Sequence, residues 1–207
     1  MKREEKNQQS RRKIVESALK EFSERGYGAS SINTICNDGD ISKGVLYHYF
    51  PDKDGVYLAC VRECFDQLVA FLRSHVMPEH GDTRTQLQAY FSARLTFFEQ
   101  HPLFQRLFCE ALISPPVHLA DTIEGIRSDF DALNIEVLDK ILDGVELCPD
   151  VTKAEVIGLF RQYQEFINIR YSPAGRAAVD IADREARCNR AVEVLLYGVI
   201  SRDGICV

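Results

Sequence analysis

The chain has 207 residues, of which 45% are hydrophobic and 27% charged, enough to bury one large core or two smaller ones. No apolar run approaches the ~20 residues that span a bilayer, and the charged start MKREEKNQQSRRK is unlike a signal peptide. The seven cysteines are irregularly spaced, which is typical of reduced thiols rather than of a disulfide framework. We therefore expect a cytoplasmic protein without a membrane segment.

Charge is divided unevenly along the chain, although the net charge is −6. Residues 1–53 contain ten Lys and Arg against eight Asp and Glu, whereas the rest contains 15 against 23. A mildly basic first part joined to an acidic body is typical of a small DNA-binding domain attached to a sensing or assembly domain. The densest basic cluster, at residues 2–13, is either a solvated helix start or an arm that reaches DNA.

The first predicted helix covers Arg11–Arg25. Ile14, Ala18 and Phe22 recur at helical spacing and form its apolar face, and Gly26 supplies the C-terminal stop. We expect this helix to pack against the two short helices that follow.

Residues 31–53, SINTICNDGDISKGVLYHYFPDK, predict two short helices joined by a tight turn. Ser31 caps the first, and Gly39-Asp40 breaks it because both residue types tolerate left-handed dihedrals. Ser42 caps the second, which runs to Phe50, where a proline stops it. This is the helix-turn-helix plan, in which the second helix enters the DNA major groove. The alternative is a helical hairpin without a DNA role.

The second short helix has two different faces. At about 100° per residue, Leu46 and Phe50 point the same way and can anchor the helix. The other side has no carboxylate, which suits a polyanion. Lysine and tyrosine can meet phosphates, glycine allows close approach, and valine can pack on a thymine methyl. We predict DNA contacts by Ser42, Lys43, Gly44, Val45, Tyr47 and His48, and a further phosphate contact by Lys53 just after the helix.

Four segments resemble the signature of the tetracycline-repressor (TetR) family of transcriptional regulators: Ile35-Cys36, residues 41–50, Asp52-Lys53, and residues 11–28 before them. The motif covers about a quarter of the chain. The family's usual Ala-Gly at the turn is Gly-Asp here, and its usual Thr in the recognition helix is Val45, which removes a hydroxyl. The resemblance also implies that Asn33 lies where the family often places a base-reading side chain.

The resemblance implies an all-α fold with two parts. Residues 1–53 would form a three-helix DNA-binding domain, and residues 54–207 a larger helical domain for ligand binding and dimerisation. It further implies a ligand-responsive, sequence-specific regulator, by default a repressor, that a small apolar or aromatic effector releases from a palindromic double-stranded operator. We expect no cofactor and no metal.

Longer helices separated mostly by prolines are predicted beyond residue 53. Single helices are predicted over residues 54–77, 83–101, 103–113, 152–171 and 181–201. Residues 117–145 hold either one helix with a break near Gly125 or two helices.

The last two predicted helices each have a broad apolar face, wider than a lone surface helix needs. Either they lie in the middle of a monomer's core, or they form a four-helix homodimer interface, which the family resemblance also implies. A twofold dimer would place two reading helices roughly 34–36 Å apart. The predicted interface residues are Phe160, Tyr163, Ile167, Val192, Leu195 and Val199.

Five phenylalanines cluster between residues 91 and 108, with charged and amide side chains between them. Aromatic-lined cavities with few polar groups are the usual ligand pockets, although a phenylalanine stripe at helical spacing is also ordinary core. The resemblance implies a cavity among these helices. We expect an effector that is mostly apolar or aromatic, with an anionic group near Arg94 or Arg106. The predicted lining is Phe91, Arg94, Phe98, Phe104 and Phe108.

Patterns that indicate catalysis are weak. No Glu-x-x-His pair of a di-iron bundle and no Gly-rich phosphate loop occur, and nothing in the spacing requires Cys109 to meet His101. We therefore expect no enzyme; the main alternative is a helical binding protein without DNA contact. Cys60 and Cys64 are neighbours at i, i+4, but they lie on an apolar stripe where cysteine acts as a small hydrophobe rather than a sensor.

Overall fold

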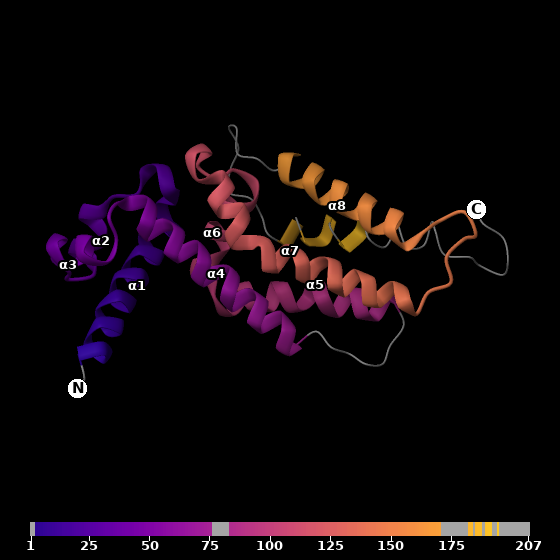
Figure 1. The fold of residues 1–207 in the computed structure, drawn as a ribbon, viewed down its shortest axis with the longest axis horizontal. Helices are drawn as coiled ribbons and strands as arrows, with labels where there is room; N and C mark the ends of the chain where they lie inside the picture. The colour runs from indigo at the N-terminus through magenta and orange to yellow at the C-terminus, as the bar shows by residue number, and fades with distance from the viewer. Residues whose placement is uncertain are drawn as a thin grey trace. The chain divides into compact units, whose positions relative to one another are not determined.

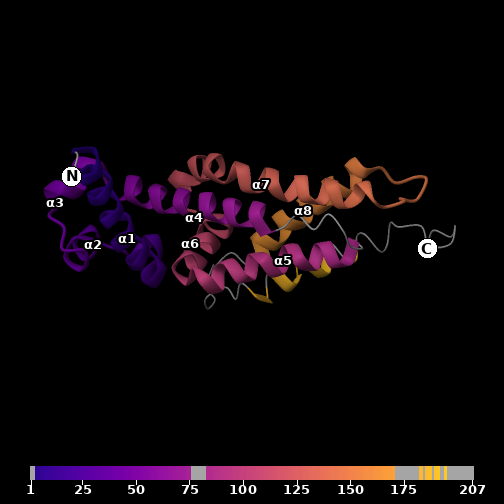
Figure 2. The same cartoon turned by 90° about the horizontal axis from the view of Figure 1, so that it is seen from below.

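The computed structural model describes residues 3–75, 83–170 and, near the C-terminus, 182–183, 185–187, 189–191 and 194. Every regular element in these ranges is a helix, which confirms the predicted all-α class (Figures 1 and 2). The elements are α1 (Arg3–Ala29), α2 (Ile32–Asp38), α3 (Lys43–Tyr49), α4 (Lys53–His75), α5 (Thr83–Gln100), α6 (Pro102–Ile113), a short 3-10 helix η1 (Val117–Leu119), α7 (Ala120–Asp143) and α8 (Lys153–Arg170).

Most helix ends fall within a few residues of the predicted ones. The open question within residues 117–145 resolves as η1 followed by the single helix α7. Gly125 does not break α7, and a Cβ added there would meet no other atom within 4 Å. The predicted helix over residues 181–201 lies largely outside the described residues.

By their contacts, the residues form two compact units. The first comprises Met1–Gln67 and His101–Arg127, and the second Leu68–Gln100 and Ser128–Val207. In the first unit, α1 packs against α2, α3 and α6. The first half of α4 and all of α6 thus belong with the N-terminal helices, and a functional boundary after residue 53 stays a prediction.

The core of the first unit follows the predicted apolar face of α1. Ile14, Ala18 and Phe22 are fully buried, and the Phe22 ring meets the Tyr57 ring of α4 edge-on, with centroids 5.1 Å apart. The helix bends at the predicted stop, because Gly26 adopts a positive φ of 71° that favours glycine. The two predicted short helices pack on this rigid base.

The described cysteines differ in state. Cys36, Cys60, Cys64 and Cys109 are free and buried, but Cys148 is disulfide-bonded, so the expectation of reduced thiols was wrong at that position. Burial raises the pKa of the Cys60 and Cys64 thiols, which keeps them protonated. Among the helices in the described ranges, none combines the length and apolar character needed to cross a bilayer.

Candidate nucleic-acid interface

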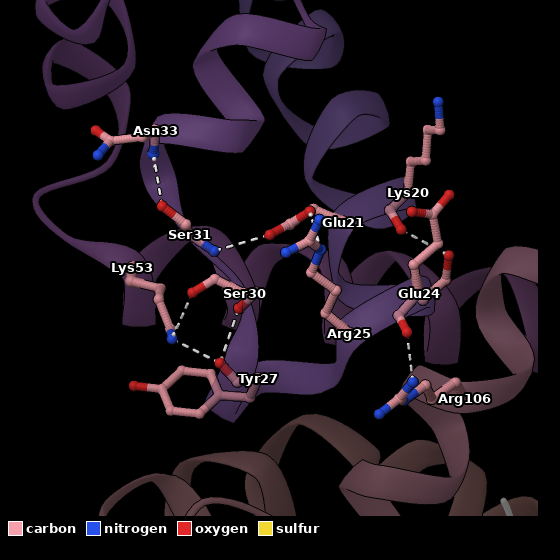
Figure 3. A network of polar contacts seen from close by, with 11 residues as sticks. Lys20, Glu21, Glu24, Arg25, Tyr27, Ser30, Ser31, Asn33, Lys53 and Arg106 are labelled. Atoms are coloured by element: carbon pink, nitrogen blue, oxygen red, sulfur yellow. Dashed lines mark hydrogen bonds and ion pairs between the residues drawn. The ribbon is translucent and has the colours of Figure 1, made fainter.

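The N-terminus of α2 is fixed by two hydrogen bonds. The Ser31 hydroxyl accepts the Asn33 N–H at 3.1 Å, which is the predicted cap, and the Ser31 N–H donates to Glu21 at 2.9 Å (Figure 3). Glu21 lies on α1, is 3% exposed, and also pairs with Arg25 at 3.4 Å. A carboxylate at a helix N-terminus is favourable because unpaired N–H groups and the helix dipole gather there. The start of α2 is therefore held by α1.

The turn between α2 and α3 closes as a Schellman motif. The Ile41 N–H donates to Cys36 O at 2.8 Å, and the Asp40 N–H donates to Asn37 O at 3.2 Å. Asp40 carries the left-handed dihedral, with φ of 47°. Aspartate tolerates this region better than most residues, so the Gly-Asp pair closes the turn although the glycine is not at the left-handed position.

Position 39 requires glycine because neighbouring atoms leave no room for a Cβ. The Gly39 φ of −82° is ordinary for any residue, so of the two residues predicted to tolerate left-handed dihedrals at this turn only Asp40 adopts one. A Cβ at this position would lie 2.5 Å from Ile41 Cδ1, 2.9 Å from Ser17 Cβ and 3.0 Å from Ile35 O. The Ser17 hydroxyl also donates to Ile35 O at 2.8 Å. The absent side chain lets α1 pack closely against the turn.

The two faces of α3 are as predicted. Ser42 caps the helix by accepting the Val45 N–H at 3.2 Å, while Leu46 and Phe50 are buried. Val45 is 42% exposed and Tyr47 50% exposed, both high values for large hydrophobic side chains. The exposed residues of this segment are Ser42, Lys43, Gly44, Val45, Tyr47 and His48, and Asn33 of α2 is exposed as well. Their contacts with DNA stay a prediction.

The beginning of α1 is attached to α3. The Tyr49 hydroxyl donates to Asn7 Oδ1, and the Arg11 guanidinium lies 5.4 Å from the centre of the Phe50 ring. Lys13 donates to Asp40 O at 3.2 Å. Part of the basic cluster therefore positions the helix-turn-helix. The local sequence pattern does not predict this role, because the partners are far apart in sequence.

Lys53 is half-buried, and its ammonium is bound to backbone carbonyls at the end of α1. Its ammonium donates to Tyr27 O at 2.5 Å and to Ser30 O at 3.1 Å, and it lies 4.3 Å from the centre of the Tyr27 ring (Figure 3). A cation on the last carbonyls of a helix is favourable. Lys53 thus caps the end of α1, and its predicted phosphate contact remains untested.

A carboxylate on α6 holds the bend of α1. Both Glu110 oxygens lie 3.1 Å from the Tyr27 nitrogen, and the Tyr57 hydroxyl donates to Oε2 at 3.3 Å. Burial raises the pKa of Glu110, while the hydrogen bonds from Tyr27 and Tyr57 oppose that rise. Arg106, also on α6, donates to Glu24 O at 2.6 Å (Figure 3). Arg106 is therefore engaged with α1.

A second polar group joins α1, α4 and η1. The Tyr27 hydroxyl donates to Asp54 Oδ1, and His118 Nε2 lies 3.0 Å from Asp54 Oδ2 and 3.3 Å from the Tyr27 oxygen. Burial and the Asp54 hydrogen bond raise the pKa of Tyr27 to about 12. Tyr27 therefore stays protonated and can keep donating. Neither this polar group nor the role of Glu110 follows from the local sequence pattern, because the partners are far apart in the chain.

The predicted pocket residues are all buried, but they divide between the units. Phe91, Arg94 and Phe98 lie in the second unit, and Phe104 and Phe108 lie in the first. Burial suits ordinary core as well as a pocket lining, so the pocket stays a prediction.

Two of the predicted interface residues have described side chains. Phe160 is buried and Tyr163 half-buried on α8, next to Leu159, which is 48% exposed. The side chain of Ile167, and all of Val192, Leu195 and Val199, lie outside the described residues.

Comparison with known proteins identifies the family of the helix-turn-helix. Residues 14–60 match the family described as bacterial regulatory proteins, tetR family. Over 112 residues the chain is 28% identical to the HTH-type transcriptional regulator RutR of Escherichia coli K12, covering 54% of this chain and 52% of RutR. It is 25% identical over 132 residues to IcaR, the biofilm operon icaADBC HTH-type negative transcriptional regulator of Staphylococcus aureus Newman, covering 63% of this chain and 68% of IcaR. The chain thus spans about half the length of RutR.

Solved structures share the fold over nearly the whole chain. FadR from Bacillus subtilis, solved in complex with stearoyl-CoA, has a TM-score of 0.65 at 15% identity, with coverage of 94% of this chain and 98% of FadR. A TetR family transcriptional regulator from Chloroflexus aurantiacus has a TM-score of 0.61 at 22% identity, covering 94% and 95%. The relatives are named as regulators, in agreement with the expectation that the chain is no enzyme. The helix-turn-helix match over residues 14–60, the named relatives and the shared fold together support a TetR family regulator.

Proposed function

We propose that the protein is a sequence-specific transcriptional regulator that binds a palindromic DNA operator as a homodimer. The observation that carries this proposal is the exposed face of α3, which has no carboxylate and presents Lys43, Tyr47 and His48 around Gly44. Because Leu46 and Phe50 anchor the opposite side, these groups are held in place before DNA arrives. A pre-positioned face loses little conformational entropy on binding.

The residues of α3 divide into two roles in this proposal. Lys43 and Tyr47 contact phosphates, so they contribute affinity for any duplex. Gly44, Val45 and His48 approach base edges, together with Asn33 of α2, so they contribute sequence preference. Because a transcriptional regulator must share a compartment with its DNA operator, we propose a cytoplasmic location.

Selection from a pool of random duplexes tests DNA recognition directly. Sequencing of the duplexes retained by the purified protein should give a palindrome whose half-sites lie about one helical turn apart, roughly 34–36 Å. The matched control is the double variant Lys43→Ala/Tyr47→Ala, which should retain little DNA. A wild-type pool without enrichment would instead support a helical binding protein that does not contact DNA.

Dimerisation is proposed through α8 and residues 181–201. The large apolar Leu159 is exposed on α8, which a second copy of the chain could cover. Leu195→Asp should give monomers in analytical ultracentrifugation and lose tight operator binding, since one reading helix makes half of the contacts. The control Glu155→Gln, on the exposed first turn of α8, should leave the dimer intact. A dimeric Leu195→Asp protein with unchanged affinity would place the interface elsewhere.

Regulation by a small apolar or aromatic effector completes the proposal. FadR of Bacillus subtilis has this fold and was solved with stearoyl-CoA, which supports regulation by a small molecule here. Within the first unit, Glu110 and Arg106 connect α6 to the bend of α1, and α4 begins beside the helix-turn-helix. A movement of α6 or α4 would therefore shift α1 and, through it, α3. A coupling of about 1–3 kcal/mol changes DNA affinity roughly 5- to 150-fold.

The effector coupling is tested by ligand screening followed by DNA titration. A compound that raises the melting temperature of the wild-type protein should also lower its affinity for the selected operator, because linkage is reciprocal. A compound bound in the second unit that leaves operator affinity unchanged would refute the coupling while leaving the DNA-binding proposal intact.

A further inference from the structure

The buried polar residues of the second unit gather in one place. Among the described residues of this unit, the buried polar or charged side chains are Arg94, Asn134 and Glu185, at 1%, 4% and 1% exposure. The equally buried hydroxyl-bearing ring of Tyr90 lies with them. The surrounding core is made of leucine, isoleucine and phenylalanine side chains. A polar cluster in such surroundings needs a physical explanation.

Arg94 is the centre of this cluster. Its Nη2 lies 3.0 Å from Glu185 Oε1, and both side chains are 1% exposed. The guanidinium carbon lies 5.0 Å from the centre of the Phe130 ring and 5.8 Å from those of Tyr90 and Phe91. The charge is thus surrounded by aromatic faces from α5 and α7, which attract a cation and restrict its position.

A hydrogen-bonded pair fixes the neighbouring wall. The Tyr90 hydroxyl donates to Asn134 Oδ1, and Asn134 Nδ2 donates to Phe130 O at 3.0 Å. Burial raises the pKa of Tyr90, so its hydroxyl remains a donor at neutral pH. The rings beside Arg94 are therefore positioned by polar contacts as well as by packing.

Stability alone does not explain a buried ion pair. Removing two charges from water costs several kcal/mol per ion, and apolar side chains of similar size are often equally or more stabilising. By contrast, an apolar site with a few fixed polar groups is the usual design of a small-molecule pocket. The cluster has that composition, with Arg94 as its cation.

We propose that Arg94 anchors the anionic group, in chemical class a carboxylate, of an effector with an apolar or aromatic body, and that Glu185 occupies the place of that group in the ligand-free protein. This inference rests on the proposed regulation by a small molecule. Exchange of one carboxylate for another keeps the buried charge balanced. The net binding energy then comes from the apolar body of the ligand against the aromatic walls.

The geometry favours an anionic ligand over a cationic one. Arginine remains charged at all physiological pH values and presents five N–H donors in a planar fork that matches a carboxylate. Arg94 is held on α5 by three rings, whereas Glu185 lies on a separate segment near the C-terminus. Glu185 is taken as the displaced partner because its carboxylate carries the same charge as the anionic group of the ligand.

Chemical rescue tests the site without knowledge of the natural effector. Glu185→Ala removes the atoms that acetate can replace. Acetate should therefore raise the melting temperature of this variant saturably, by about 5–10 °C at 100-fold excess over Kd. Acetamide at the same concentration, and chloride at the same ionic strength, are the matched controls and should give no such rise. Arg94→Met in the same background should abolish the response. An acetate effect no larger than that of acetamide, or one that survives Arg94→Met, would overturn the proposal.

A second variant covers the case in which Glu185→Ala does not fold. Glu185→Gln keeps the size of the side chain but removes the competing charge. Phenylacetate and hexanoate should then bind this variant roughly 5- to 150-fold more tightly than wild type, as measured by calorimetry. Their amides should show no difference between the two proteins. Equal affinities for acids and amides, or no binding of either acid to Glu185→Gln, would overturn the proposal.

These readouts do not involve DNA, so the two proposals can fail separately. If carboxylates bind as expected but wild-type protein enriches no duplex from a random pool, the anion site stands and the proposed DNA-binding function fails. If an operator is selected but the carboxylate tests fail, only the anion site is lost.

Discussion

The two compact units use buried charge in different ways. In the first, the carboxylates of the buried Glu21 and the half-buried Glu110 accept backbone N–H groups, at the start of α2 and at the bend of α1. In the second, Arg94 and Glu185 pair with each other among aromatic rings. Buried charge in the first unit therefore fixes helix positions, which a rigid DNA-reading element needs. The charge in the second unit is suited to exchange for a ligand.

The largest expected effect comes from breaking the Arg94–Glu185 pair on one side. Arg94→Ala leaves Glu185 buried without this partner, and the loss should be about 3–5 kcal/mol of unfolding free energy, measured by urea denaturation. The double variant Arg94→Met/Glu185→Leu should recover most of that stability because no charge remains buried. If the double variant were as unstable as the single one, the pair would have a structural role and the contrast between the units would fail.

A smaller effect is expected where α1 meets the turn. Gly39→Ala forces a Cβ to within 3.0 Å of Ile35 O, a backbone atom, and should cost about 1–3 kcal/mol in thermal denaturation. The matched control is Gly44→Ala, whose Cβ would meet only Ser42 Oγ, at 4.0 Å. Gly44→Ala should leave stability unchanged or slightly higher and should change the preferred DNA sequence instead. A stable Gly39→Ala protein would show that the turn can relax.

The pH dependence of stability gives the subtlest test of the first unit. The folded protein raises the pKa of Glu110, so the contribution of its protonated form is present at low pH and is lost as pH rises through the raised value. Glu110→Gln cannot titrate, so its unfolding free energy should fall less than that of wild type as pH rises from about 4 to 7. Parallel pH profiles for the two proteins would contradict this assignment.

The elements that the sequence predicted well depend on neighbouring residues. The caps at Ser31 and Ser42, the interruption of helical dihedrals at Gly26 and the buried face of α3 all follow from local capping and periodicity. The sequence did not predict that position 39 needs glycine for lack of space, because close contact with Ser17 on α1 decides this and a local pattern does not contain that contact.

The contacts that the sequence did not predict join distant parts of the chain. Glu110 meets Tyr27, and Asn7 meets Tyr49, only because α6 and the start of α1 pack against the helix-turn-helix. Arg94 was predicted as a pocket residue from its aromatic neighbours on α5, but its acidic partner Glu185 lies far away in sequence. Charge pairing across a fold depends on topology, which residue periodicity does not determine.

The most direct test of DNA recognition by α3 is operator affinity measured across salt concentrations, for wild type and for Lys43→Ala. Each lost phosphate contact should lower the slope of log K against log salt by about 0.9, so Lys43→Ala should bind more weakly with a correspondingly shallower slope. His48→Ala is the matched control, and it should change the preferred sequence while keeping the wild-type slope. Wild-type binding that does not vary between low and moderate ionic strength would contradict the account.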